Sequence, residues 1–215
     1  TYYRFRGALS EVKALQQPHL PIYFGGSSDA AVEVAAKHAD CYALWGEGRD
    51  EVRDAIRQVR AAAARHGRSP RFSVSFRPIL AATEAAAWDR ARRILRQVKA
   101  LRARLGLGAP PLPQNVGSQR LLAAAARGDV LDKRLWTAIA AATGARGNTT
   151  ALVGTPEQVA ETLMEYYDLG VTTFLIRGFD PLEDAIDYGR HLLPLVHAEA
   201  ARRERDAGTD RVASG

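Results

Sequence analysis

A short loop of two glycines and two serines is the segment of this sequence best suited to bind a phosphate group. Gly25-Gly26-Ser27-Ser28 follows a short apolar run and precedes a segment of helical composition. Glycines let the backbone approach a ligand, and the hydroxyls and the N–H groups of a following helix can donate hydrogen bonds to phosphate oxygens. An ordinary turn with a serine N-cap explains the same tetrapeptide. The loop lacks the Gly-x-Gly-x-x-Gly spacing of a dinucleotide site and the Gly-Lys-Ser/Thr of a P-loop.

Three further side chains stand where loops are expected. Trp45 ends a second apolar run, where an indole can wall a flat cofactor or an apolar substrate, or can pack at the rim. Arg77 ends a third run and Arg146 lies in a Gly-rich stretch; each suits a carboxylate, sulfonate or phosphate, or is a solvated charge. The histidines lack metal-ligand spacing and Cys41 is the single cysteine, so we expect no metal site.

The elements that must position these loops alternate between apolar runs and helical segments. Strands are predicted at 20–24, 41–45, 72–80 and 171–176. Helices are predicted at 30–38, 50–66, 84–105, 119–126, 131–142, 156–167 and 182–201. Such strand–helix–strand units form a parallel sheet with right-handed crossovers. The pattern fits a doubly wound sheet or a (β/α)8 barrel, and in both the chemistry lies on the loops that follow the strands.

Regular alternation stops at residues 106–149 and again at the end of the chain. An insertion as long as 106–149 predicts a lid. The polar tail 206–215 is expected to be disordered. The chain opens at Thr1 without an initiator methionine, so we expect either that a segment was removed or that the sequence is a fragment.

Composition limits the class of protein. Hydrophobic residues make up 47% and charged residues 25%, which is typical of globular domains and argues against a disordered, collagen-like or membrane-spanning chain. With no long apolar run, no signal peptide and one cysteine, the sequence predicts a cytoplasmic protein without a membrane partner. The net charge is +6, but the arginines alternate with acidic residues and aromatics are only 7%, which argues against a nucleic-acid partner.

Five segments occur in the same order as in a known group of enzymes. They are Gln16 to Ala31 around the glycine–serine loop, Tyr42 to Glu47, Val116 to Arg120, Thr150 to Gly154 and Gly178 to Ala185. These segments resemble the flavin-dependent alkanesulfonate monooxygenases, a branch of the bacterial luciferase-like superfamily. The resemblance implies a (β/α)8 TIM barrel of the luciferase-like type, of which residues 1–205 are the C-terminal portion, strands five to eight, with the insertion before strand eight. We therefore expect a fragment that is poorly stable or associated, and inactive, on its own.

The resemblance also implies a chemistry. Enzymes of this group take reduced FMN from a separate NAD(P)H-dependent flavin reductase and use O2 to split the C–S bond of an alkanesulfonate into an aldehyde and sulfite. Two alternatives are an oxidoreductase that uses the deazaflavin F420 and transfers hydride, and a non-catalytic truncated remnant. A small-molecule substrate and a homo-oligomer are expected.

Site residues follow from the same resemblance. The cofactor-binding residues would be Gly25, Gly26, Ser27 and Ser28, which would hold the FMN phosphate. Trp45 matches a tryptophan of the active site, and Arg146 lies one position from the lid arginine that closes over the substrate.

Departures from the group lie on the substrate side. Ser75 and Arg77 stand where the sulfonate enzymes carry an arginine and a histidine, and Arg177-Gly178-Phe179 stands where they carry Ser-Gly-Tyr. We therefore assign Trp45, Arg77 and Arg146 to catalysis and Arg177 and Phe179 to substrate binding, and we expect the two strand-end arginines to bind an anion.

Overall fold

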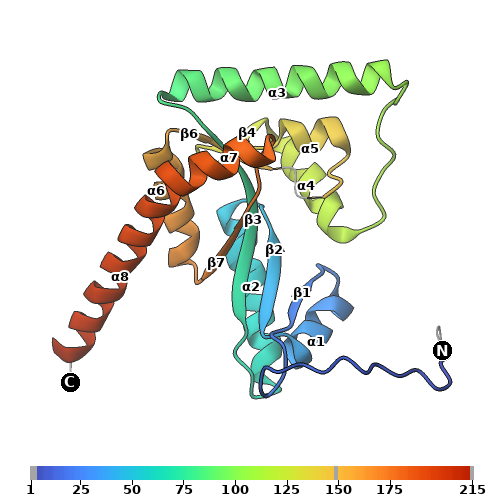
Figure 1. Cartoon of the computed structure of the whole chain (residues 1–215), viewed down its shortest axis with the longest axis vertical. Coiled ribbons are helices and arrows are strands. Elements are labelled where there is room, and N and C mark those ends of the chain that lie inside the picture. Colours follow the sequence, from blue (N-terminus) through green and yellow to red (C-terminus); the bar gives the residue numbers. More distant parts are fainter. Residues whose placement is uncertain (1–3, 148–149, 214–215) are drawn as a thin grey trace.

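Four parallel strands form the centre of the molecule, and their order in space is their order in the chain (Figure 1). The structure is a computed structural model that describes residues 4–147 and 150–213, with side chains up to Asp206. The four strands are β1 (Tyr23–Gly25), β2 (Cys41–Trp45), β3 (Arg71–Leu80) and β7 (Thr173–Ile176). A doubly wound sheet would reverse its strand order, whereas β1-β2-β3-β7 continues in one direction as an arc of a (β/α)8 barrel does. The predicted fold class, a partial barrel of parallel strands, is confirmed.

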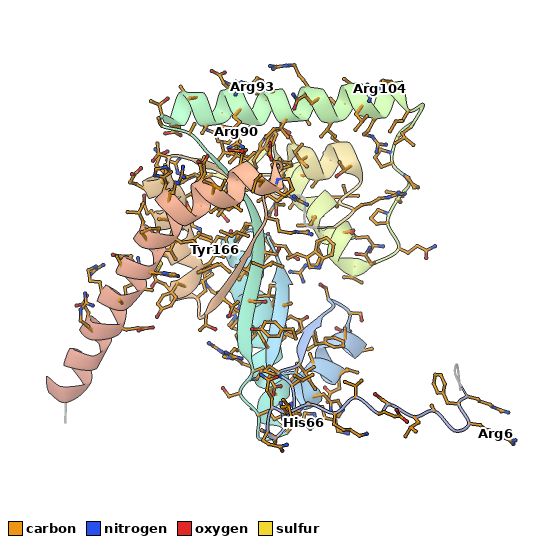
Figure 2. All side chains as sticks on the ribbon, in the orientation of Figure 1. Arg6, His66, Arg90, Arg93, Arg104 and Tyr166 are labelled. Carbon is orange, nitrogen blue, oxygen red and sulfur yellow. The ribbon has the colours of Figure 1, made fainter. Side chains whose placement is uncertain are left out.

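Helices pack against one face of this sheet. They are α1 (Asp29–His38), α2 (Arg49–Ala64), α6 (Pro156–Asp168), the π-helical turn η1 (Tyr188–Leu192) and α8 (Leu193–Ala213). Phe72, Val74 and Phe76 of β3 point towards them and share one buried cluster with Ile56 of α2. The ring of Tyr166 in α6 lies 4.9 Å from the ring of Phe76, and Figure 2 shows Tyr166 between its helix and the sheet.

The opposite face of the sheet carries small and polar side chains. Because successive residues of a strand point to opposite faces, Ala43 of β2 and Ser73 and Ser75 of β3 lie on the face away from the helices. Leu175 of β7 pairs in register with Ser75 and is 54% exposed. This second face is therefore only partly covered by the residues that the structure describes.

Strand β3 changes partners along its length. Its first half pairs with β2 on one edge and with β7 on the other. Arg71 and Arg77 are six residues apart, so their N–H groups face the same edge of β3. The Arg71 N–H donates to the carbonyl of Asp40, in front of β2, and the Arg77 N–H donates to the carbonyl of Thr150, in front of β6. Beyond the end of β2, strand β6 (Ala151–Gly154) therefore continues along the edge that β2 has left.

The predicted insertion packs onto this second half of β3. It follows α3 (Glu84–Arg104) and contains α4 (Val116–Arg127), β4 (Val130–Leu131), β5 (Leu135–Trp136) and α5 (Ala138–Thr143). Strands β4, β5 and β6 form an antiparallel extension of the sheet. Asn148 and Thr149, the last two positions assigned to the lid, lie outside the described residues.

Two helix predictions are wrong in their extent. The helix expected at 131–142 is a hairpin followed by the short helix α5, because Asp132 (φ 45°) and Lys133 (φ 67°) adopt a left-handed backbone that ends a helix. The last helix continues to Ala213, beyond its predicted end at residue 201. Arg202 pairs with Asp206 at 2.8 Å one turn further on, which supports this continuation.

Strand β1 begins three residues later than predicted, and strands β4, β5 and β6 are absent from the sequence-based prediction. Leu20, in the predicted start of β1, is 56% exposed and lies outside the sheet. The hairpin strands β4 and β5 have two residues each, which is too short for an alternating pattern to be read.

Candidate functional site

The glycine–serine loop connects β1 to α1 and is fixed by local contacts. The Ser28 hydroxyl caps α1 by accepting a hydrogen bond from the Ala31 N–H at 3.2 Å. A β-carbon on Gly26 would lie 2.7 Å from the β-carbon of Ala31, so only glycine lets the loop pack this closely on the helix. The hydroxyl of Tyr42 donates a hydrogen bond to the Gly26 carbonyl. The predicted N-cap is confirmed, and Ser27 is left as the loop hydroxyl that makes no hydrogen bond among the described residues.

This loop fits a phosphate group. Gly26 brings the backbone against the first turn of a ten-residue helix, where N–H groups and the positive end of the helix dipole attract an anion. Gly25 is exposed, and Ser27 is partly exposed beside it. These residues would hold the phosphate of a flavin, and a bound reduced flavin would supply the reducing electrons for oxygen chemistry.

Trp45 lies at the end of β2 and is covered by the insertion. A β-carbon placed on Gly117, in the first turn of α4, would lie 3.3 Å from both Cε2 and Nε1 of Trp45 and 3.6 Å from the Ser27 hydroxyl oxygen. The indole also packs on the small cluster that contains Leu121. The structure thus brings Trp45 and the glycine–serine loop to the same place, under α4.

Glu47 is a buried acidic residue in this region that sequence reasoning did not assign. Its side chain is 8% exposed, and Oε2 accepts hydrogen bonds from Nε and Nη2 of Arg120 in α4 at 2.9 Å and 2.5 Å. The Glu47 carbonyl accepts a hydrogen bond from the Tyr166 hydroxyl at 2.8 Å. Burial raises the pKa of Glu47, and the Arg120 guanidinium opposes that rise.

Arg77, Arg177 and Phe179 come together where β3 and β7 run side by side. Nη1 of Arg77 donates to the Gly178 carbonyl at 2.8 Å, and the Arg77 guanidinium carbon lies 5.3 Å from the centre of the Phe179 ring. Partial burial lowers the pKa of Arg77, and the positive charge of Arg177 lowers it further. The two guanidinium groups repel each other, and the Phe179 ring lies beside one of them. An anion bound between the two charges would relieve this repulsion.

A buried aspartate shapes the loop that carries Arg177 and Phe179. Oδ2 of Asp184, in α7 (Pro181–Asp187), accepts hydrogen bonds from the N–H groups of Phe179 at 2.7 Å and Asp180 at 3.0 Å. Its other oxygen pairs with Arg90, which Figure 2 shows pointing from α3 towards α7. A β-carbon on Gly178 would lie 2.2 Å from the β-carbon of Asp184, so this loop also needs its glycine. The acidic start of α7 after Pro181 is the sequence signal for this role.

Arg146 is the predicted site residue that the structure does not connect to the others. It is exposed, and among the described residues its guanidinium makes no hydrogen bond or ion pair. Its neighbour Ala145 is buried, and the Ala145 carbonyl accepts a hydrogen bond from the Ser118 hydroxyl at 2.7 Å.

Residues 4–147 and 150–213 lack both a metal cluster and a membrane-spanning helix. They contain no group of three or more His, Cys, Asp or Glu side chains placed to hold a metal ion. None of their helices combines the length and the apolar character needed to cross a membrane.

Comparison with known proteins places this arrangement in a family. A family model described as luciferase-like monooxygenase matches residues 1–173. Among solved structures, a riboflavin lyase (RcaE) with modified FMN and riboflavin superposes with a TM-score of 0.61 at 22% identity, covering 83% of this chain and 43% of that one. The long-chain alkane monooxygenase LadA superposes with a TM-score of 0.59 at 18% identity, covering 85% and 42%. An F420-dependent secondary alcohol dehydrogenase in complex with an F420–acetone adduct superposes with a TM-score of 0.51 at 14% identity, covering 84% and 50%.

The chain spans half or less of the length of each of these three proteins. At such low identity the structural matches support the fold alone, whereas the family match extends over most of the chain. The chain belongs to the luciferase-like monooxygenase family.

Proposed function

We propose that this chain forms the C-terminal part of a monooxygenase barrel that uses reduced FMN and O2 to oxidise a small organic anion. The observation that carries the proposal is the juxtaposition of the Gly26–Ser28 loop and Trp45 under the first turn of α4. In this arrangement Gly25, Gly26, Ser27 and Ser28 bind the phosphate of the flavin. Trp45 lines the neighbouring space and helps to exclude water from it.

The substrate side is proposed to bind an anionic group. Arg77, in the second half of β3, and Arg177, directly after β7, supply two positive charges, and Phe179 lies against the first of them. Carboxylates, sulfonates and phosphates all accept paired hydrogen bonds from a guanidinium, so a sulfonate is one member of the class. Arg146 is proposed to join this site from the insertion when substrate is bound.

Partners follow from the chemistry. Reduced FMN oxidises readily, so we propose that a separate NAD(P)H-dependent flavin reductase delivers it in the cytoplasm. We also propose that the enzyme works as a homo-oligomer.

The test of the cofactor uses Ser27→Ala in the longest native polypeptide that contains these residues. Losing one hydrogen bond to a charged phosphate should raise the dissociation constant of FMN by roughly tenfold or more. Ser27 is suited to this test because Ser28, and not Ser27, caps α1. Ser69→Ala, at an exposed serine in front of β3, is the matched control and should leave FMN binding unchanged.

The same titration with F420 tests the second cofactor, which the similarity to an F420-dependent alcohol dehydrogenase favours. Tight binding of F420 with no binding of FMN would replace the oxygenase proposal by a hydride-transferring oxidoreductase. Binding of neither cofactor would contradict both.

The test of the substrate class is Arg77→Ala. Removing one of two guanidinium groups should raise KM for anionic substrates by at least about tenfold and leave KM for neutral analogues unchanged. Steady-state assays with a matched anionic and neutral pair measure the difference. An equal change for both substrates, or no change for any anion, would refute an anion site at Arg77.

A further inference from the structure

One point of contact joins the insertion to the phosphate loop. Gly117 in α4 lies against both Trp45 and Ser27, close enough that a β-carbon at position 117 would press on the indole at 3.3 Å. Asn115 caps this end of α4, and its Oδ1 accepts the Ser118 N–H at 2.7 Å. The first turn of α4 is therefore an ordered structure that covers the loop.

An ion pair holds α4 from one side, directly after its first turn. Arg120 lies three residues after Gly117, so both residues are on one face of the helix. Its partner Glu47 follows Trp45 by two residues and is buried. A second pair on the same helix, Arg127 with Glu51 at 2.7 Å, has an arginine that is 54% exposed. The pair that contains the buried Glu47 thus lies beside the contact with the loop, and the more exposed pair lies two turns away.

We propose that the ion pair between the buried Glu47 and the partly exposed Arg120 holds the first turn of α4 against Trp45 and Ser27, so that the insertion and the phosphate loop open and close together. Glu47 and Arg120 are then positioning residues for this site. The proposal rests on the proposed function for the identity of the ligand in the loop. The coupling between α4 and the loop is a property of the chain itself.

The charges around Glu47 explain why Arg120 is needed. The groups that face Glu47 are Arg120 from α4, Glu51 from α2, the Tyr42 hydroxyl from β2 and, at its carbonyl, the Tyr166 hydroxyl from α6. Of these, Arg120 stabilises the ionised carboxylate, whereas Glu51 and burial oppose it. Removing one partner of a buried pair leaves an uncompensated charge, which is costly, while neutralising both partners often costs little.

Hydrogen exchange measured by mass spectrometry tests the coupling without any cofactor. In Arg120→Met, amides of residues 116–122 and of residues 25–31 should both exchange faster, on the order of a hundredfold, because the buried charge drives local opening. Arg120→Lys keeps the charge and should restore part of the protection in both segments. Arg127→Met is the matched control on the same helix and should leave residues 25–31 unchanged.

A pH series separates a charge effect from a packing effect. The pKa of Glu47 is already raised by burial, and it rises further without Arg120. A raised carboxyl pKa means that the folded protein takes up a proton as the pH falls, so the variant should regain stability on acidification. The urea midpoint of Arg120→Met should therefore approach that of the unsubstituted protein between pH 7.5 and pH 5. The double variant Glu47→Gln/Arg120→Met should show no such recovery.

The outcomes are distinct. Faster exchange confined to residues 116–122, or an equal effect of Arg127→Met on residues 25–31, would overturn the proposal. If Arg120→Met does not fold, Glu47→Gln gives the same test, and both segments should again exchange faster. Failure of the longest native polypeptide that contains these residues to bind FMN would overturn the proposed function and leave the exchange result standing.

Discussion

At the level of single residues, Asp184 of α7 fixes the loop after β7 through three directional contacts. Its carboxylate is 1% exposed, accepts two backbone N–H groups and pairs with Arg90. Through these bonds it holds Phe179 beside Arg77. Removing this buried carboxylate should destabilise the fold strongly, because two backbone N–H groups and the Arg90 guanidinium would lose their acceptor.

Asp184→Ala should lower the free energy of unfolding by about 3–5 kcal/mol, the range found when one partner of a buried ion pair is removed. Urea unfolding of the longest native polypeptide that contains these residues, followed by circular dichroism, measures this loss. Asp89→Ala removes the carboxylate of an exposed pair with Arg92 and should change stability far less than Asp184→Ala does. Similar losses for the two variants would show that Asp184 has no special role.

Sequence reasoning singled out the Gly25–Ser28 loop and the two arginines, whose roles remain predictions, but it missed the acidic residues that pack beside them. The loop carries a local signal, since glycines and hydroxyls in front of a helix describe its geometry within four residues. Glu47 and Arg120 are 73 residues apart, and Asp184 and Arg90 are 94 apart. Such pairs depend on which helices pack together, and a single sequence does not determine that.

At the level of elements, α8 is supported by a set of surface charges. Glu199 accepts hydrogen bonds from Arg202 at 2.6 Å and 2.9 Å and from Arg203 at 3.0 Å. These arginines lower the pKa of Glu199 from 4.5 to about 2. A lowered carboxyl pKa stabilises the folded state above the unfolded pKa, and this contribution is lost as the pH falls through the folded value.

The helical content at the end of α8 should therefore fall between about pH 4.5 and pH 2, and Glu199→Gln should remove that part of the pH dependence. Hydrogen exchange of amides 193–206 across this range gives the measurement. High salt should reduce the effect, because the pairs are exposed to solvent. Identical pH profiles for the variant and the unsubstituted protein would rule out a role for this carboxylate.

The bounds of helices with several turns were predicted well from the sequence, whereas the short strands of the insertion were not predicted. The helices α1, α2, α3 and α6 lie within two residues of their predicted bounds because each has a cap and several turns of amphipathic pattern. The segment 131–142 has helical composition, yet its hairpin is imposed by pairing of β5 with β6. Tertiary pairing overrides local propensity in a segment this short.

At the scale of the whole molecule, the four parallel strands β1, β2, β3 and β7 have a free edge at each end and a half-covered face. Among the described strands, β1 and β7 each pair with a neighbour on one side only. Exposed parallel edges attract further strands, and the exposed Leu175 adds apolar surface beside β7. The 215-residue chain expressed by itself should therefore associate and bind FMN weakly.

Leu175→Lys should reduce this association, because a lysine on an edge strand opposes pairing with another strand. Light scattering after size-exclusion chromatography should show a smaller apparent mass over a range of concentrations. Leu182→Lys, at a leucine of α7 that is 67% exposed, is the matched control and should leave the association unchanged. A monomeric, cooperatively melting chain without any substitution would contradict the expectation.

The change of partner along β3 sets the limits within which this protein can be recombined with its relatives. Strand β6 belongs to the insertion through β5 and to the barrel through Arg77–Leu80 of β3. A chimera that exchanges residues 106–149 alone would join a foreign hairpin to a native β6, and the pairing of Leu135 with Leu152 would have to be rebuilt. The natural cut lies after Gly154, in front of the helix that Thr155 caps. An exchange that ends at this point would transfer β4, β5 and β6 together and keep their pairing with one another intact.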